Sequence, residues 1–223
     1  ASATSGFSIV KYTGTGANAT VGHGLGVAPK MIILKDLDSA QSWSVYNKNI
    51  GYGNFLSLNS TNALAASTSR FTADPSSSVF SIGDNASGNG SGNNFIAYCF
   101  ADVQGYSKFG SYTGNGNADG TFVYTGFSPA FVLVKQSSGT NSWVMYDNKR
   151  DLSNVTEQIL RPDTNGAEDT EAGAKFDFLS NGFKCRGSGA GIGQTNNSGA
   201  TYIYMAFAEN PFVASNFNAA TAR

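Results

Sequence analysis

The chain has 223 residues, of which 40% are hydrophobic and 13% aromatic, so it is long and apolar enough to build a sizeable core. Only 13% of the residues are charged, about half of the roughly 25% that is usual in soluble domains, and the formal net charge is −1. The scarcity of charged residues and the slightly negative net charge argue against a nucleic-acid-binding surface. The sequence contains no run of about 18 apolar residues, which a membrane-spanning helix would need. We therefore expect neither nucleic acid nor membrane insertion.

In the first half of the chain, short apolar runs alternate with turns rich in Gly and Asn, which is typical of β-strands. Residues 31–34 (Met-Ile-Ile-Leu) are apolar at every position, so we expect a central strand that is buried on both faces. Pro29 stands just before this strand, where its missing N–H does least harm. In chain order, the predicted strands are 6–14, 19–22, 31–34, 43–46, 55–59, 69–72, 78–82 and 95–102.

Most of this pattern occurs a second time. Pro29, Lys35, Trp43 and Tyr46 each have a counterpart of the same type 100 residues later, as in Trp143 (143 − 43 = 100). The spacing grows to 103 and then 107 toward the end of the copies, which places the insertions in loops. Chance does not hold so many anchors in register, so we predict a tandem duplication. The matching strands are 106–114, 121–124, 131–134, 143–146, 158–161, 175–178, 182–185 and 202–209.

Strands at this spacing, with almost no helix, predict an all-β protein of two tandem β-sandwich or jelly-roll repeats. The first repeat is predicted at residues 1–103 and the second at 104–212, followed by a C-terminal tail at 213–223. Residues 151–160 leave an alternative open, in which a helical turn capped by Asp151 or Ser153 precedes the strand.

Catalytic and metal-binding patterns have little support. His23 is the only histidine, it stands between two glycines, and its counterpart in the second copy is Val123. We therefore expect a structural role for His23 in a turn rather than a Ser-His-Asp relay. One histidine with two distant cysteines is not a zinc pattern, so the chain is predicted to be no enzyme and to need no cofactor or metal. Cys99 and Cys185 are expected to be buried free thiols.

Two acidic groups could in principle bind Ca²⁺ together with Asn oxygens. They are Asp36 with Asp38, and Glu168 and Asp169 with Glu171, but no Asp-x-Asp-x-Asn-Gly loop accompanies them. We favour solvated loop acids as their interpretation.

A Gly-rich loop precedes the last strand of each copy, at residues 83–94 and 187–199. The second loop is no dinucleotide fingerprint, because no helix and no βαβ unit follow it. Each loop is either a long hairpin connection or a recognition tip, whose amides would suit neutral sugars or a protein partner. The candidate recognition residues are Asp84, Asn85, Asn89, Asn93, Gln194, Asn196 and Asn197.

Several longer stretches resemble a known family. They are 23–35, 42–46 (Ser-Trp-Ser-Val-Tyr), 96–102, 105–116, 122–127 and 177–183 (Asp-Phe-Leu-Ser-Asn-Gly-Phe). The chain resembles, over residues 6–212, a two-repeat β-sandwich domain of unassigned function found in structural proteins of tailed bacteriophages. The resemblance implies a concanavalin-like sandwich and a place on the virion surface, in a tail fibre or appendage or as a capsid decoration. It carries no catalytic residues.

The expected function is therefore that of a non-enzymatic virion structural protein that forms a homo-oligomer. Its expected partners are copies of itself and other virion proteins, with host-surface glycan as a further partner through the Gly/Asn loops. The main alternative is a stand-alone carbohydrate-binding, lectin-like module. A polysaccharide depolymerase is less favoured, because no acid pair is signalled and charged residues are scarce.

Overall fold

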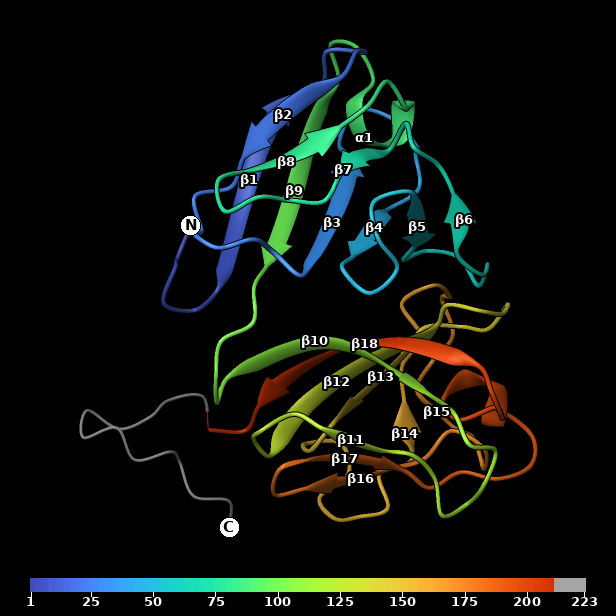
Figure 1. Ribbon diagram of the computed structural model, residues 1–223. Helices are drawn as coiled ribbons and strands as arrows, with labels where there is room; N and C mark the ends of the chain where they lie inside the picture. The colour runs from blue at the N-terminus through green and yellow to red at the C-terminus, as the bar shows by residue number, and fades with distance from the viewer. Residues whose placement is uncertain (211–223) are drawn as a thin grey trace. The chain divides into compact units, whose positions relative to one another are not determined.

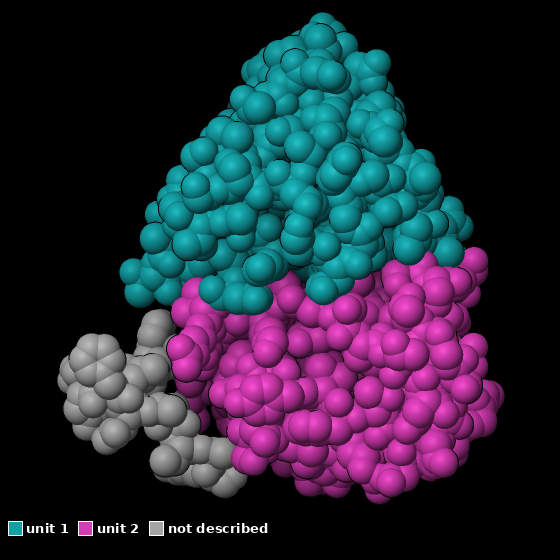
Figure 2. Space-filling view, viewed as in Figure 1, with its two compact units in different colours: residues 1–102 teal, residues 103–223 magenta. Residues whose placement is uncertain are grey.

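The computed structural model describes residues 1–210, and nearly all of its regular secondary structure is antiparallel β-sheet (Figure 1). The prediction of an all-β, sandwich-like fold is confirmed at this level. Contacts divide the chain into unit 1, Ala1–Asp102, and unit 2, which begins at Val103 (Figure 2). The predicted tail at 213–223 lies outside the described residues. No helix within residues 1–210 is both long enough and apolar enough to cross a membrane.

Unit 1 has two antiparallel sheets. The larger one has the order β1-β9-β3-β4-β5-β6, and the smaller one has the order β2-β8-β7. A single turn of helix, α1 (Ala86–Asn89), lies in the Gly-rich loop. The strands are β1 (Phe7–Thr13), β2 (Ala19–Gly22), β3 (Met31–Asp36), β4 (Ser44–Asn47), β5 (Asn54–Ser57), β6 (Ala65–Ala66), β7 (Phe71–Ala73), β8 (Val79–Ile82) and β9 (Asn94–Phe100).

Within the described residues, unit 2 has three antiparallel sheets. Its four-stranded sheet has the order β10-β18-β12-β13, its three-stranded sheet the order β11-β17-β16, and β14 pairs with β15. A short 3₁₀ turn, η1 (Ile192–Gln194), occupies the Gly-rich loop. The strands are β10 (Ser107–Thr113), β11 (Phe122–Tyr124), β12 (Pro129–Gln136), β13 (Val144–Asp147), β14 (Gln158–Ile159), β15 (Asp169–Thr170), β16 (Phe176–Leu179), β17 (Gly182–Cys185) and β18 (Thr201–Ala208).

The core of each unit lies between the sheet that contains its first strand and the three-stranded sheet. In unit 1, Ile32 and Leu34 of β3 join one buried cluster with Phe80 and Ile82 of β8. Successive strand residues point to opposite faces, so alternate side chains of both sheets reach the same interior. The prediction of a central, fully apolar strand is confirmed, because β3 lies between β9 and β4 and residues 31–34 are all buried.

The two cysteines belong to these cores. Cys99 lies in the cluster of unit 1 and Cys185 in that of unit 2, and both are free thiols, as predicted. Burial raises the pKa of each thiol to about 12, so both remain protonated and unreactive at neutral pH.

The helical turn considered for residues 151–160 is wrong. The structure has bends there, and the Asp151 carboxylate caps a different feature. Its Oδ2 accepts the backbone N–H groups of Glu157 at 2.7 Å and Gln158 at 2.6 Å, at the start of β14. The acid therefore satisfies strand N–H groups instead of a helix terminus. The two-residue strands β6 and β15 were not predicted, because two residues show no periodicity.

Candidate functional site

The Gly-rich loop of unit 1 folds back onto the connection between β1 and β2 and is fixed there by Asn89, a side chain only 1% exposed. Its Oδ1 accepts the backbone N–H of Thr15 at 2.8 Å. Its Nδ2 donates to the carbonyl oxygens of Ala17 at 2.6 Å and Gly83 at 2.7 Å. The side chain thus satisfies main-chain groups of two separate loops, and its bond to Gly83 is buried.

Unit 2 contains the same arrangement 107 positions further on (196 − 89 = 107). Asn196 is fully buried, and its Oδ1 accepts the backbone N–H of Asn115 at 3.0 Å. Its Nδ2 donates to the carbonyl oxygen of Asn117 at 2.8 Å. We call Asn89 and Asn196, with the hydrogen bonds of their side chains, the loop latches.

A tyrosine supports each latch. Tyr12 of β1 donates its hydroxyl to the carbonyl oxygen of Gly88 at 2.5 Å. Tyr112 of β10 donates in the same way to the carbonyl oxygen of Thr195 at 2.6 Å. Burial raises the pKa of both phenols, so they remain hydrogen-bond donors at neutral pH. The loops are consequently held at two points in each unit.

The remaining predicted recognition residues divide between loop structure and surface. Gln194 is buried and hydrogen-bonds with Glu171 and with Nε of Arg161, the latter at 3.2 Å. Asn85 caps α1 by accepting the N–H of Ser87 at 3.0 Å, and Asn93 donates to Asp36 at 2.8 Å. Only Asp84 and Asn197 are exposed. The structure therefore gives Asn89, Gln194 and Asn196 a place inside the protein, away from any surface ligand.

His23 has the structural role that was predicted for it. The ring is 1% exposed, and its Nδ1 accepts the backbone N–H of Leu25 at 3.2 Å. The other nitrogen, Nε2, therefore carries the proton and donates to the carbonyl oxygen of Ser76 at 3.1 Å. Both ring nitrogens are used to hold a turn.

The interpretation as solvated loop acids holds for Asp38, Glu168 and Asp169, which are exposed, and it is wrong for Asp36, which is 1% exposed. In unit 2, Arg161 pairs with Asp169 at 3.0 Å and with Glu171 at 2.6 Å, and Arg150 pairs with Glu168 at 3.1 Å. Within residues 1–210, no three His, Cys, Asp or Glu side chains are grouped so that they could hold a metal ion.

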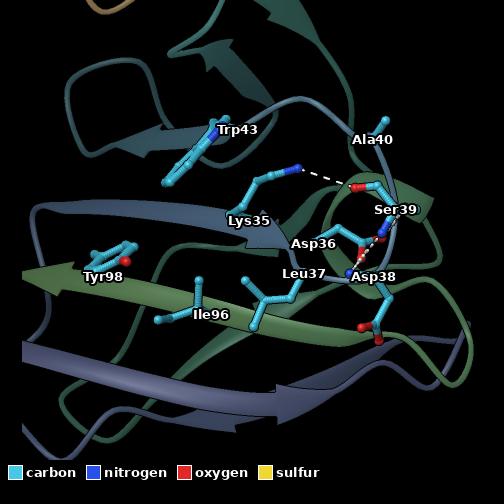
Figure 3. A pocket seen from close by; sticks show the side chains of 9 residues that line it. All are labelled: Lys35, Asp36, Leu37, Asp38, Ser39, Ala40, Trp43, Ile96 and Tyr98. Carbon is cyan, nitrogen blue, oxygen red and sulfur yellow. Dashed lines mark hydrogen bonds between the residues drawn. The ribbon is translucent and has the colours of Figure 1, made fainter.

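Unit 1 carries a surface hollow that was not predicted (Figure 3). It has a volume of about 440 Å³ and lies over the face of the large sheet that is opposite to the core. The residues that line it are Lys35, Asp36, Leu37, Asp38, Ser39, Ala40, Trp43, Ile96 and Tyr98. Strand alternation in β9 was the signal that could have found it, because Ile96 and Tyr98 point away from the buried Phe95, Ala97 and Cys99.

Two half-buried aromatic rings form one wall of this hollow. Trp43 precedes β4 and Tyr98 belongs to β9, and these two strands are the neighbours of β3. The ring centroids are 6.5 Å apart and the ring planes differ by 17°. Two strands that are far apart in sequence thus bring two nearly parallel rings into a stacked arrangement.

The opposite wall is polar. Lys35 donates from Nζ to the carbonyl oxygens of Gln41 at 2.8 Å and Ser39 at 3.3 Å. Asp38 is exposed, and its Oδ2 accepts two hydrogen bonds from Asn94, at 2.6 and 2.9 Å. Lys35 and Asp38 therefore offer a donor and an acceptor beside the aromatic wall.

Asp36 organises the loop that forms this polar wall. It is 1% exposed, and its carboxylate accepts hydrogen bonds from Ser39 Oγ at 2.6 Å, Asn93 at 2.8 Å and the backbone N–H of Asp38 at 2.9 Å. Burial alone would raise the pKa of Asp36, but these hydrogen bonds outweigh it and hold the pKa below its ordinary value.

The lowered pKa of Asp36 predicts a pH dependence of stability. A carboxyl whose pKa is lower in the folded state contributes stability above its unfolded pKa of about 4, and this contribution is lost as the pH falls through the folded value. We expect Asp36→Asn to lower the free energy of unfolding by about 1–3 kcal/mol at pH 7, and the difference from wild type to shrink below about pH 4. Urea unfolding at both pH values measures this. A difference that stays constant, or grows toward acid pH, would contradict it.

The matching positions of unit 2 have different chemistry. Met205 stands where unit 1 has Tyr98 (205 − 98 = 107), and Gln136 and Ser138 stand in place of Asp36 and Asp38. The aromatic pair with two adjacent acids therefore belongs to unit 1 alone. Unit 2 has a smaller hollow of about 280 Å³, which is lined mainly by polar groups and includes Asp151 and Asn154 but no aromatic pair.

Comparison with known proteins finds one relationship. No curated protein matches the chain, and no solved structure matches it. A family profile described as a domain of unknown function (DUF7483) matches residues 1–211, which is nearly the whole chain. The chain therefore belongs to the DUF7483 family.

Proposed function

We propose that this chain is a non-enzymatic structural protein of a bacteriophage virion, either in a tail fibre or appendage or as a decoration of the capsid surface. The resemblance of the repeated motifs to domains of such proteins supports this proposal, and the loop latches carry it structurally. Assembly with copies of itself and with other virion proteins is part of the proposal.

The loop latches support a structural role because they fix the two Gly-rich loops, which would otherwise be expected to be mobile. Long Gly- and Asn-rich loops are usually the most mobile and most easily cleaved parts of a domain. Here the side chains of Asn89 and Asn196 tie each loop to the connection between the first two strands of its unit with the same bonds. A particle component that remains outside the cell benefits from this rigidity.

We further propose that the two units are tandem copies of one jelly-roll or concanavalin-like sandwich. The shared orders β1-β9-β3-β4 and β10-β18-β12-β13 support this, as do β2-β8-β7 and β11-β17-β16. The loop latches occupy matching places in both units, which random similarity of two β-folds would not produce.

The carboxylates favour binding over hydrolysis. A glycosidase needs two carboxyl groups on either side of the scissile bond, one of which can give up or take a proton. In unit 2, the acids that lie close in sequence are paired with Arg150 and Arg161. In unit 1, the Asp36 carboxylate is occupied by hydrogen bonds from its own loop. A depolymerase therefore remains the weakest alternative.

A lectin-like binding module is the second candidate, and the hollow with Trp43 and Tyr98 favours it. The two functions differ in assembly. A virion subunit should form a defined oligomer or polymer, whereas a stand-alone lectin can work as a monomer.

Light scattering of the purified protein tests the proposal. We expect a mass that is an integer multiple, greater than one, of the 23.3 kDa chain. The low charge disfavours mutual repulsion, and exposed apolar side chains such as Tyr124 and Phe122 are available for contacts. Residues 211–213 (Pro-Phe-Val) are apolar in sequence and also favour an oligomer, but they lie outside the described residues. A monomer at tens of micromolar would count against assembly and favour the lectin-like alternative.

A further inference from the structure

We propose that the hollow of unit 1 is a carbohydrate-binding site for a neutral polysaccharide, with a pyranose ring packed on Trp43 and Tyr98 and its hydroxyl groups bound by Lys35 and Asp38. This inference deepens the proposed function by naming a ligand for the virion surface. The inference rests on the proposed function only in where the glycan would come from, namely a host surface that the virion meets.

The aromatic wall fits the apolar face of a sugar ring. The faces of aromatic rings carry partial negative charge, and the C–H groups of a pyranose carry partial positive charge. Trp43 and Tyr98 present two nearly parallel faces with centroids 6.5 Å apart. The exposed side chain of Leu37 and the half-buried Ile96 extend the apolar surface beside them. Apolar walls with a few placed polar groups are the usual composition of a small-ligand site.

The polar wall can donate a hydrogen bond to one sugar hydroxyl group and accept a hydrogen bond from another. The ammonium of Lys35 has three N–H donors, and two of them are directed to the carbonyl oxygens of Ser39 and Gln41, so one can bind a ligand oxygen. In Asp38, Oδ2 is used by Asn94, and Oδ1 has no hydrogen-bond partner among the described residues. A sugar hydroxyl can donate to that oxygen while another hydroxyl accepts from Lys35.

The charges favour a neutral glycan over an anionic one. The hollow contains the carboxylates of Asp36 and Asp38 and one cation, Lys35, whose donors are largely occupied by main-chain oxygens. The lowered pKa of Asp36 keeps this carboxyl ionised at neutral pH. An incoming carboxylate or sulfate group would therefore meet net negative charge at a distance within the range of Coulomb repulsion.

Isothermal titration calorimetry of the full chain tests the inference, with a neutral glucan, mannan and galactan and one anionic polyuronate as probes. We expect at least one neutral polysaccharide to bind, and the polyuronate to bind more weakly or not at all. Trp43→Ala should weaken binding by about tenfold or more, and Tyr98→Met, which introduces the residue of unit 2, by about threefold to tenfold. Tyr52→Ala is the matched control, because Tyr52 is an exposed aromatic of unit 1 outside the hollow, and it should bind as wild type does.

The chain also contains a built-in reporter, because Trp43 and Trp143 are its only tryptophans. In a Trp143→Phe background, the fluorescence of Trp43 should shift on addition of the bound polysaccharide and become less accessible to acrylamide. Calorimetry of the wild-type chain keeps the test independent of how well this variant folds.

Three results would overturn the inference. They are no binding of any neutral probe, binding that Trp43→Ala and Tyr98→Met leave unchanged, and tighter binding of the polyuronate than of every neutral probe. The mass from light scattering involves no glycan. An oligomer that binds no sugar would therefore reject the carbohydrate site and leave the structural function standing. A monomer that binds sugar through Trp43 would support the carbohydrate site and count against the structural function.

Discussion

Replacing Phe183 by alanine should lower the free energy of unfolding by about 3–5 kcal/mol, which is the usual cost of deleting a fully buried phenyl ring. Phe183 lies on β17 with no exposed surface. Its ring centroid is 5.0 Å from that of Phe176 in the same three-stranded sheet and 5.4 Å from that of Tyr204 on β18, so the ring connects the three-stranded and four-stranded sheets of unit 2. Removing the ring leaves a cavity between these sheets. The cavity stays open because the surrounding side chains are closely packed and cannot move in to fill it.

Urea unfolding, followed by tyrosine and tryptophan fluorescence, measures this effect. Phe183→Leu should cost distinctly less than Phe183→Ala, because most of the volume remains. Phe122→Ala is the surface control, since Phe122 is 45% exposed on the neighbouring strand β11, and it should change stability by less than about 0.5 kcal/mol. If Phe183→Ala and Phe122→Ala proved equally mild, the sandwich core of unit 2 described above would be wrong.

Removing a loop latch should have the second largest effect. We expect Asn196→Ala and Asn89→Ala each to lower the free energy of unfolding by about 2–4 kcal/mol, because each removes several hydrogen bonds between a buried amide side chain and main-chain groups. The affected groups in unit 1 are the N–H of Thr15 and the carbonyl groups of Ala17 and Gly83.

Limited proteolysis adds a local measurement to the unfolding data. The Gly-rich loop of the mutated unit should be cleaved faster than in wild type, while the loop of the other unit keeps its resistance. Asn197→Ala is the matched control, because Asn197 is exposed and its side chain makes no hydrogen bond to described residues. Equal resistance of Asn196→Ala and Asn197→Ala would show that the loop is rigid for another reason.

The strands could be predicted because their signals are local. Residues 31–34 are apolar without interruption, and an apolar run of this length followed by turn residues indicates a buried strand whatever its partners are. The repeat added information, since a weak strand in one copy could be supported by its counterpart in the other. Thr121–Tyr124 was assigned in this way, and β11 covers Phe122–Tyr124.

The candidate site could not be predicted because it depends on the order of strands. Trp43 and Tyr98 are separated by more than half of unit 1, and they meet only because β4 and β9 both pair with β3. The asparagines of the Gly-rich loops could be found in the sequence, but their roles could not be predicted from it. An asparagine that latches a loop and one that binds a sugar have the same side chain and the same neighbours in sequence, and only burial separates Asn196 from Asn197.

Immunogold labelling of purified phage particles that encode this chain tests the central claim most directly. Antibodies raised against the purified protein should label intact virions at a fixed position, on the tail or over the capsid surface, with no need to disrupt the particle. Label confined to infected-cell lysate, with intact and disrupted virions both unlabelled, would contradict a place in the virion.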